Sequence, residues 1–276
     1  MNVAATTTQT PDYTAIKSKQ NAAWSSGDYK RIGVTLQITG EALAETAGLA
    51  AGSKVLDVAA GNGNATLAFA RRWCAVTSTD YVASLLEAGQ RRADAEGLSA
   101  KFRVADAEDL PFADGAFDGV VSTFGVMFTP DQKRSASEMV RVCRSGGKIA
   151  MANWTPDGFI GALFRTMGKH VPPPSGTKSP ALWGDRRWIG ETFAHAAGSI
   201  STTIKHFNFR YASPQQFIDF FRTYYGPMHK AFAAVGAEGE QALTDDLLAL
   251  IDGYNAATDG SMLVPSDYAE IIVERA

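Results

Sequence analysis

Short apolar segments alternate with helical patterns between residues 55 and 154, and this alternation constrains the fold more than any other feature. Strands separated by helices predict parallel pairing through right-handed crossovers. The strands are apolar on both faces, as expected for a sheet covered by helices on both sides. The predicted strands are 55–59, 75–79, 102–105, 117–123 and 148–154, and the predicted helices are 64–72, 83–96 and 131–144.

The pattern changes after Trp154. A helical stretch over 187–197 precedes an alternating segment, 200–211, which predicts a strand. Residues 214–258 are predicted to form three helices rich in Phe and Tyr, and 268–274 a last strand. We expect the two late strands to pair antiparallel at the sheet edge. The predicted fold is therefore α/β and Rossmann-like: a seven-stranded, mostly parallel sheet with helices on both faces, an antiparallel edge strand and a helical lid.

The same patterns divide the chain into four parts. The first is a polar, Thr-rich stretch without the apolar core of a signal peptide, which is predicted to be disordered. A helical segment with breaks at Gly27 and Gly33 follows, and we expect it to close over a cofactor. The predicted parts are a tail (1–11), an N-terminal helical segment (12–48), an α/β core (49–211 plus 262–276) and a helical lid (212–261).

Composition narrows the class of function. A net charge of -3 provides no basic surface, so we expect no nucleic-acid partner. The two cysteines and four histidines form no recognisable metal motif, so no metal is predicted. No apolar run approaches the roughly 20 residues of a membrane span. We therefore expect a cytoplasmic enzyme that acts on a small molecule and does not bind a membrane. It is expected to be a monomer or a homodimer.

A glycine-rich loop follows the first predicted strand. Gly61 and Gly63 allow the backbone to approach a ligand closely, and Asn62 tolerates a left-handed conformation. Ligands of open α/β sheets bind at the carboxyl ends of the strands, where this loop lies. The dinucleotide fingerprint G-x-G-x-x-G would require a third glycine where Thr66 stands. An NAD(P)-linked oxidoreductase is the alternative interpretation, and the missing third glycine disfavours it.

Acidic residues accompany three successive strands. Asp57 lies in the first strand, Asp80 ends the second and Asp106 follows the third, while residues 55–66 contain no Lys or Arg. A carboxylate at the second strand end matches two ribose hydroxyls, and Asp106 can accept a hydrogen bond from an adenine amino group. S-adenosylmethionine (SAM) carries cationic groups and no phosphate, so an acidic crevice suits it as the cofactor.

At these residues the sequence resembles the class I SAM-dependent methyltransferases. It is most similar to the methyltransferase type 11 branch that contains the ubiquinone/menaquinone C-methyltransferases. The resemblance rests on five motifs: residues 55–64, Asp80, residues 105–112, residues 117–122 and residues 138–147. It implies that Ala59, Gly61 and Gly63 line the methionine end, that Asp80 binds the ribose, that Asp106 and Ala107 hold adenine, and that Ser122 or Thr123 and Phe124 lie near the methyl group. We include Asp57, Asn62, Tyr81 and Glu108 in the same predicted cofactor site.

Two further segments bear on the substrate side. The segment around Trp24 and Tyr29 is similar to one that folds over SAM in a bacterial subgroup, so both side chains are predicted to close the cofactor pocket. Many relatives carry a histidine where this chain has Met127-Phe128, which indicates an apolar neighbourhood around the methyl donor.

No catalytic base is assigned from the sequence; His195, His229, Asp28 and Tyr225 are candidates only. Aromatic residues of the predicted lid favour a small, apolar or aromatic methyl acceptor. A non-catalytic protein of the same fold is the third interpretation, which the complete set of glycines and acids disfavours.

Overall fold

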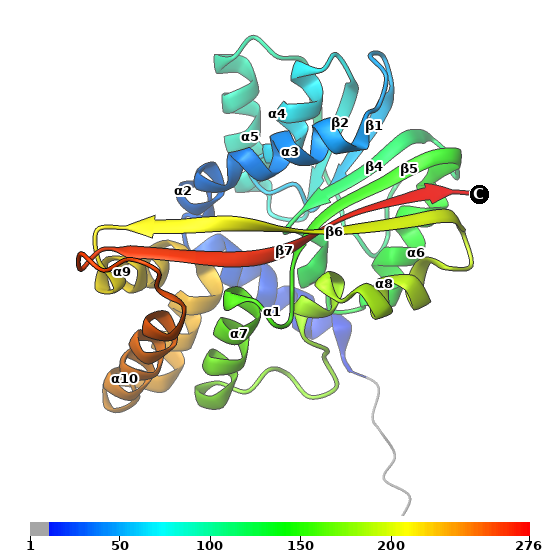
Figure 1. The fold of residues 1–276 in the computed structure, drawn as a ribbon. Helices are drawn as coiled ribbons and strands as arrows, with labels where there is room; N and C mark the ends of the chain where they lie inside the picture. Colours follow the sequence, from blue (N-terminus) through cyan, green and yellow to red (C-terminus); the bar gives the residue numbers. More distant parts are fainter. Residues whose placement is uncertain (1–10) are drawn as a thin grey trace, which may run out of the picture.

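The computed structural model describes residues 11–276, so the predicted disordered tail lies outside the described residues except for Pro11. Within that range, one sheet has the strand order β3-β2-β1-β4-β5-β7-β6 (Figure 1). The first five strands are mutually parallel, and β7 runs antiparallel to β5 and to β6. The predicted fold class is confirmed. The strands are β1 (Lys54–Val58), β2 (Ala75–Asp80), β3 (Ala100–Val104), β4 (Phe117–Thr123), β5 (Cys143–Trp154), β6 (Ala197–Tyr211) and β7 (Met262–Arg275).

The two late strands are longer than predicted. The sequence pattern predicts a last strand from Tyr268, whereas β7 begins at Met262 and pairs with β6 through Pro265, opposite Asn208. A proline argues against a strand when only the sequence is read. The antiparallel strand β7 lies one position inside the edge, and β6 forms the edge itself. The carboxyl ends of β1, β2, β3 and β4 lie along one border of the sheet.

Helices cover both faces of the sheet. Figure 1 shows α3 (Gln37–Ala47), α4 (Asn64–Arg71) and α5 (Ala83–Ala95) on one side, and α6 (Gln132–Val142) and α8 (Arg186–Phe193) on the other. Large apolar side chains of the central strands, such as Leu56 and Ile149, are fully buried between these layers. Burial of this kind is the main source of stability in such a fold.

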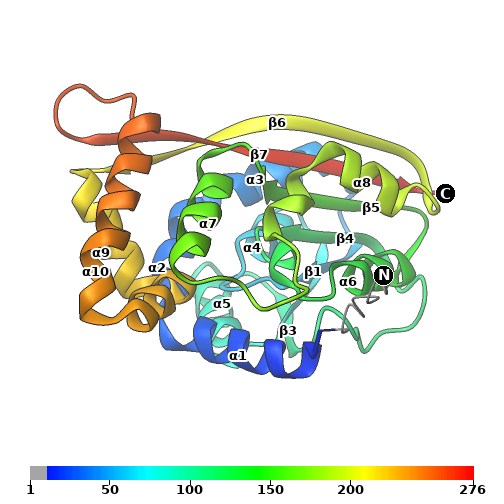
Figure 2. The same ribbon diagram turned by 90° about the horizontal axis from the view of Figure 1, so that it is seen from below.

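A block of helices packs beneath the long ends of β6 and β7 (Figure 2). It comprises α9 (Pro214–Tyr224), α10 (Gly226–Tyr254) and also α7 (Phe159–His170), which was not predicted. Gly236 has a non-helical conformation and divides α10 in two, so residues 214–254 form the predicted three helices. No helix within residues 11–276 is long and apolar enough to cross a bilayer.

The N-terminal helical segment breaks where the sequence predicted. Helix α1 (Tyr13–Ser26) ends at Gly27, and α2 (Tyr29–Gly33) leads through the short helix η1 (Val34–Leu36) into α3. Two other 3-10 helices follow later, η2 (Val126–Phe128) and η3 (Pro180–Gly184). Helix α1 lies along the border formed by the carboxyl ends of the strands (Figure 2).

Candidate cofactor site

The loop between β1 and α4 makes a tight turn at the carboxyl border of the sheet. Gly61 and Gly63 have φ values of 55° and 85°, which glycine adopts without strain. Ala59 has a φ of 51°, a conformation that costs a residue with a side chain about 1 kcal/mol or more. Strained residues of this kind concentrate at functional sites.

A second loop, after β4, interlocks with the first. Phe124 also lies in the left-handed region, with a φ of 53°. At the next residue, Gly125, an added Cβ would stand 1.9 Å from the carbonyl oxygen of Ala59. The two loops therefore meet backbone against backbone, and both strained residues lie at that contact.

Asp57 lies behind the loop and not in the pocket. Its Oδ2 accepts hydrogen bonds from the backbone N–H of Thr66 at 2.8 Å and from its hydroxyl at 2.7 Å. Burial raises the pKa of Asp57 to about 7. In dinucleotide-binding folds a pyrophosphate sits at this helix N-terminus. Here a buried carboxyl occupies the underside of the first turn of α4, which disfavours an anion.

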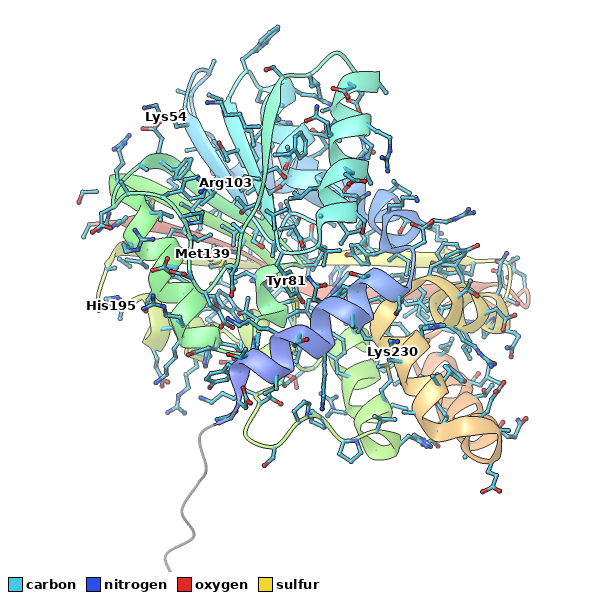
Figure 3. All side chains as sticks on the ribbon, turned by 180° about the vertical axis from the view of Figure 1, so that it is seen from behind. Lys54, Tyr81, Arg103, Met139, His195 and Lys230 are labelled. Atoms are coloured by element: carbon cyan, nitrogen blue, oxygen red, sulfur yellow. The ribbon has the colours of Figure 1, made fainter. Side chains whose placement is uncertain are left out.

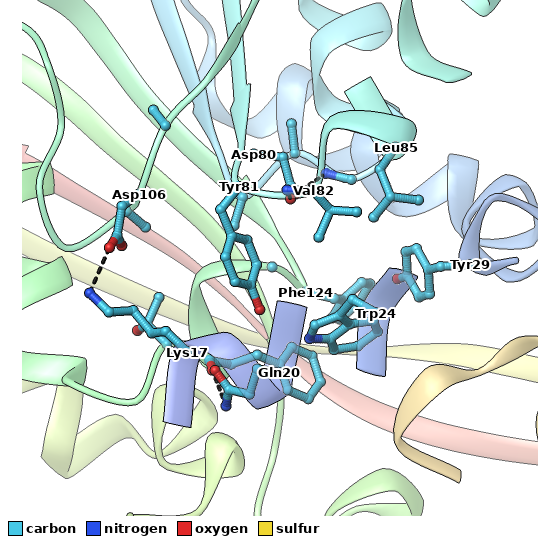
Figure 4. A pocket seen from close by; sticks show the side chains of 18 of the residues that line it. Lys17, Gln20, Trp24, Tyr29, Asp80, Tyr81, Val82, Leu85, Asp106 and Phe124 are labelled. Carbon is cyan, nitrogen blue, oxygen red and sulfur yellow. Dashed lines mark hydrogen bonds and ion pairs between the residues drawn. The ribbon is translucent and has the colours of Figure 1, made fainter. Parts of the chain in front are cut away.

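Asp80 joins the loop after β1 to the loop after β2. Its Oδ2 accepts from the Gly61 N–H and its Oδ1 from the Val82 N–H, both at 2.8 Å. The residue is 5% exposed, and burial raises the pKa of its carboxyl to about 6. Each carboxylate oxygen has two lone pairs, so each retains one for a ligand. Asp80 borders the pocket next to Tyr81 (Figure 4).

Lys17, on α1, is a pocket residue that the sequence analysis missed. Its Nζ lies 2.6 Å from Oδ2 of Asp106 and 3.0 Å from Oε2 of Glu108 (Figure 4). The other oxygens of these carboxylates accept from backbone N–H groups of Glu108 and Asp131. Lys17 stands 89 residues before Asp106, so no local pattern could have linked them.

An aromatic cluster forms the other side of the pocket. The ring of Trp24 lies 5.4 Å from that of Tyr29, 5.0 Å from that of Phe128 and 5.5 Å from that of Tyr225, all edge to face. Phe124 stacks on Trp154 at 4.0 Å. These rings come from α1, the start of α2, the loop after β4, the end of β5 and the α9–α10 junction. They are distant in sequence and converge only in the fold.

All the predicted site residues except Asp57, Gly63 and Ser122 line one pocket. The hydroxyl of Ser122 donates to the Val58 carbonyl at 2.7 Å and accepts from the Val126 N–H, so it braces two loops from behind. Gly63 begins α4. Asp57, Gly63 and Ser122 therefore hold the backbone around the pocket in place but do not line the pocket.

None of the four candidate bases lines the pocket. His195 is exposed at the side of the molecule, away from the Tyr81 region that α1 crosses (Figure 3). Tyr225 packs behind Trp24, and burial raises the pKa of its hydroxyl. Residues 212–261, the predicted lid, contribute no lining residue either. Their Phe217 and Phe221 are buried in the helical block.

The fold and the pocket define a class: a doubly wound α/β protein with a nucleoside-type site at the carboxyl border of its sheet. Comparison with known families narrows it. A model described as "Methyltransferase domain" matches residues 56–151. This segment belongs to that family, and the chain is a SAM-dependent methyltransferase, as the sequence motifs predicted.

Three known proteins are similar to this chain in sequence or in fold. An uncharacterized protein of Mycobacterium tuberculosis is 38% identical over 242 residues, which cover 87% of this chain and 88% of the relative. A demethylmenaquinone methyltransferase of Thermus thermophilus is 32% identical over 143 residues, covering 50% and 65%. The crystal structure of a putative methyltransferase from Bacillus halodurans has the same fold, with a TM-score of 0.60, 20% identity and coverage of 86% and 97%.

The residues present fit SAM as the cofactor. Lys17 is the sole cationic side chain among the described lining residues, and it forms ion pairs with Asp106 and Glu108. A pyrophosphate would therefore find no free cation, whereas a cationic ligand meets Asp80. Thr66 replaces the third glycine of the dinucleotide fingerprint and is bound to Asp57. These features, together with the family match, favour SAM over a dinucleotide and disfavour the oxidoreductase interpretation.

Proposed function

We propose that the chain transfers a methyl group from SAM to a small, apolar or aromatic molecule. The observation that carries this proposal is the division of the pocket. Lys17 and Asp106 lie on one side, Trp24, Phe124 and Tyr29 lie on the other, and Asp80 and Tyr81 lie between them (Figure 4). An aromatic wall without charged side chains favours an uncharged acceptor. The name of the Thermus thermophilus relative gives demethylmenaquinone as its acceptor, which also supports a small molecule.

The division also suggests how the cofactor is held. The two free lone pairs of Asp80 match the ribose hydroxyls, and Asp106 with Ala107 would hold the adenine. The backbones of Ala59 and Gly61 would line the methionine end, so that the methyl group faces Thr123 and Phe124. The region beyond it, bounded by Trp24 and Phe128, is then the place for the acceptor.

SAM supplies an electrophilic methyl group on a sulfonium, which a nucleophile displaces in line. The contribution of the chain is to align the acceptor and to exclude water. The edge-to-face packing of Trp24 against three rings holds this wall rigid. Burial raises the pKa of Tyr29, so its hydroxyl stays protonated at neutral pH and is available as a hydrogen-bond donor. We propose no side-chain base: the acceptor gives its proton to solvent water before it is enclosed, and its oxygen then forms a bond to the methyl carbon as the bond from that carbon to sulfur breaks and SAH leaves.

A panel of acceptors tests the proposed substrate class. We expect methyl transfer from labelled SAM to uncharged phenols or quinols, and none to amino acids, polyamines or RNA. Replacing Trp24 by alanine should lower kcat/KM for an accepted phenol by about tenfold or more, because the wall loses its central ring. SAH binding serves as the control and should change less. Transfer to charged acceptors alone would refute the proposed class.

The pH dependence of cofactor binding tests the role of Asp80. Its pKa is raised to about 6, so the carboxylate that accepts two hydroxyls is lost as the pH falls through that value. Binding of S-adenosylhomocysteine (SAH), measured by calorimetry, should therefore weaken about tenfold between about pH 7.5 and pH 5. The Asp80→Asn variant cannot titrate and should bind weakly at both pH values. A wild-type affinity that is constant over this range would contradict the assignment.

A further inference from the structure

Helix α1 is docked on the pocket through polar side chains on one face. Lys17 reaches Asp106 and Glu108, the Nε2 of Gln20 donates to the Phe128 carbonyl at 3.1 Å, and the Nδ2 of Asn21 donates to the Tyr81 carbonyl at 2.9 Å. Positions 17, 20, 21 and 24 follow the spacing of a single helix face. The helix thus spans the loops after β2, β3 and β4, and Ile16 is its one buried residue.

The two ends of α1 are held differently. At the C-terminal end an added Cβ on Gly27 would lie 2.5 Å from the Tyr224 carbonyl oxygen, and one on Gly226 would lie 2.2 Å from that of Ala23. The Asp28 N–H also donates to the Tyr224 carbonyl at 3.2 Å. This end is fixed by close backbone packing against the α9–α10 junction. A side chain at either glycine would push α1 away from the α9–α10 junction.

The N-terminal half of α1 has no comparable packing among the described residues. Pro11 lies against Gly176 of the exposed segment that follows α7, and Ile16 is buried. The other strong contact is the Lys17 bridge to two carboxylates. Lys17 is 27% exposed, so solvent and salt reach this bridge. An ion pair of that kind weakens with ionic strength, unlike the packing at Gly27.

We propose that residues 13–22 of α1 form a gate for cofactor exchange, anchored by the packing of Ala23 and Gly27 against the α9–α10 junction and latched by the bridge from Lys17 to Asp106 and Glu108. This inference rests on the proposed place of the cofactor beneath α1. Lys17 and Gln20 line the pocket, so displacement of residues 13–22 opens its side next to Asp106. This displacement also breaks the hydrogen bonds that Gln20 and Asn21 donate to the neighbouring loops. The latch is ionic and partly exposed, so the exchange rate depends on salt.

The release of SAH measures the gate directly. Trp24 lies on α1 beside the pocket, so its fluorescence reports ligand departure in a stopped-flow displacement experiment. We expect Lys17→Met to release SAH about 5- to 10-fold faster than wild type, as for the loss of a partly exposed bridge to two carboxylates. Lys17→Arg should restore slow release. Lys19→Met, an exposed position on the same helix, is the matched control and should behave as wild type.

Salt dependence separates a latch from a purely structural role. Between about 50 mM and about 500 mM NaCl, release from the wild type should accelerate severalfold, whereas release from Lys17→Met should stay constant. Release from Lys17→Met within twofold of the Lys19→Met rate would overturn the proposal. A salt response that persists in Lys17→Met would also overturn it.

Hydrogen exchange in the protein without cofactor tests the gate independently of the cofactor's place. Amides of residues 13–22 should exchange about tenfold faster in Lys17→Met than in wild type, while those of α2 and α3 should not change. Unchanged exchange over 13–22 would refute the latch, even if SAH binds elsewhere. Loss of SAH binding by the wild type would instead count against the proposed site.

Discussion

Replacing Asp80 by alanine is expected to weaken SAH binding by about 1.5–3 kcal/mol, which is roughly 10- to 150-fold. In the proposed binding mode, the variant loses the acceptor for two ribose hydroxyls. It also loses the carboxylate that ties the Gly61 and Val82 backbones together. Both losses act on the cofactor and not on the acceptor, so the KM for SAM should rise while the choice of acceptor stays the same.

Asp94→Ala is the matched control for this variant. Asp94 is exposed on α5, and its carboxylate accepts from Gln90 on the same helix. Its replacement should leave SAH affinity within twofold of wild type. NADH should bind neither protein tightly, because Asp57 lies beneath the helix end that a pyrophosphate requires. An Asp80→Ala protein that binds SAH like the wild type would show that the ribose lies elsewhere.

The sheet could be predicted from sequence because its signals are local. The apolar strands and the glycine stops of the helices recur within a few residues of each other, so the bounds of β1 to β4 are predicted to within two residues. Strand β5 begins at Cys143, inside the segment predicted as helix 131–144. Helix α7 was missed because Gly158 and Gly161 at its start resemble a loop, whereas both glycines are needed for close packing. An added Cβ on Gly161 would stand 2.3 Å from the Pro156 carbonyl oxygen.

The direction of side chains within strands explains which of the predicted site residues lie outside the pocket. Asp57 and Ser122 each stand one position before the last residue of their strands, where side chains still point into the layers that cover the sheet. Asp80 is the last residue of β2, and Asp106 lies beyond the end of β3. One position thus separates a residue that borders the pocket from one that braces it.

The aromatic residues show why composition alone does not identify the side chains that line the pocket. Phe217 and Phe221 of the predicted lid are buried against Phe209, where they stabilise the helical block. The pocket takes its aromatic wall from Trp24 and Phe128, which lie 104 positions apart. Contacts of this range depend on how α1 docks, and no periodicity within the sequence encodes that docking.

Replacing Gly125 by alanine should have the largest effect on the site as a whole. The new Cβ would stand 1.9 Å from the Ala59 carbonyl oxygen, a backbone atom that no rotamer change can move. One loop must retreat, although Ala59 and Phe124 are already held in the left-handed region. We expect a loss of about 2–4 kcal/mol in the free energy of unfolding and at least a tenfold loss of SAH affinity.

Gly168→Ala provides the control for Gly125→Ala. Gly168 lies within α7, and an added Cβ there would meet nothing within 4 Å. Alanine favours a helix more than glycine does, so this variant should unfold at the same or a higher denaturant concentration, by up to about 1 kcal/mol. Urea unfolding and SAH titration of both variants separate the general effect of a methyl group from the specific one. If Gly125→Ala matched Gly168→Ala in both measurements, the loops after β1 and β4 would not be interlocked, and the strain at Ala59 and Phe124 would have no role in holding the pocket.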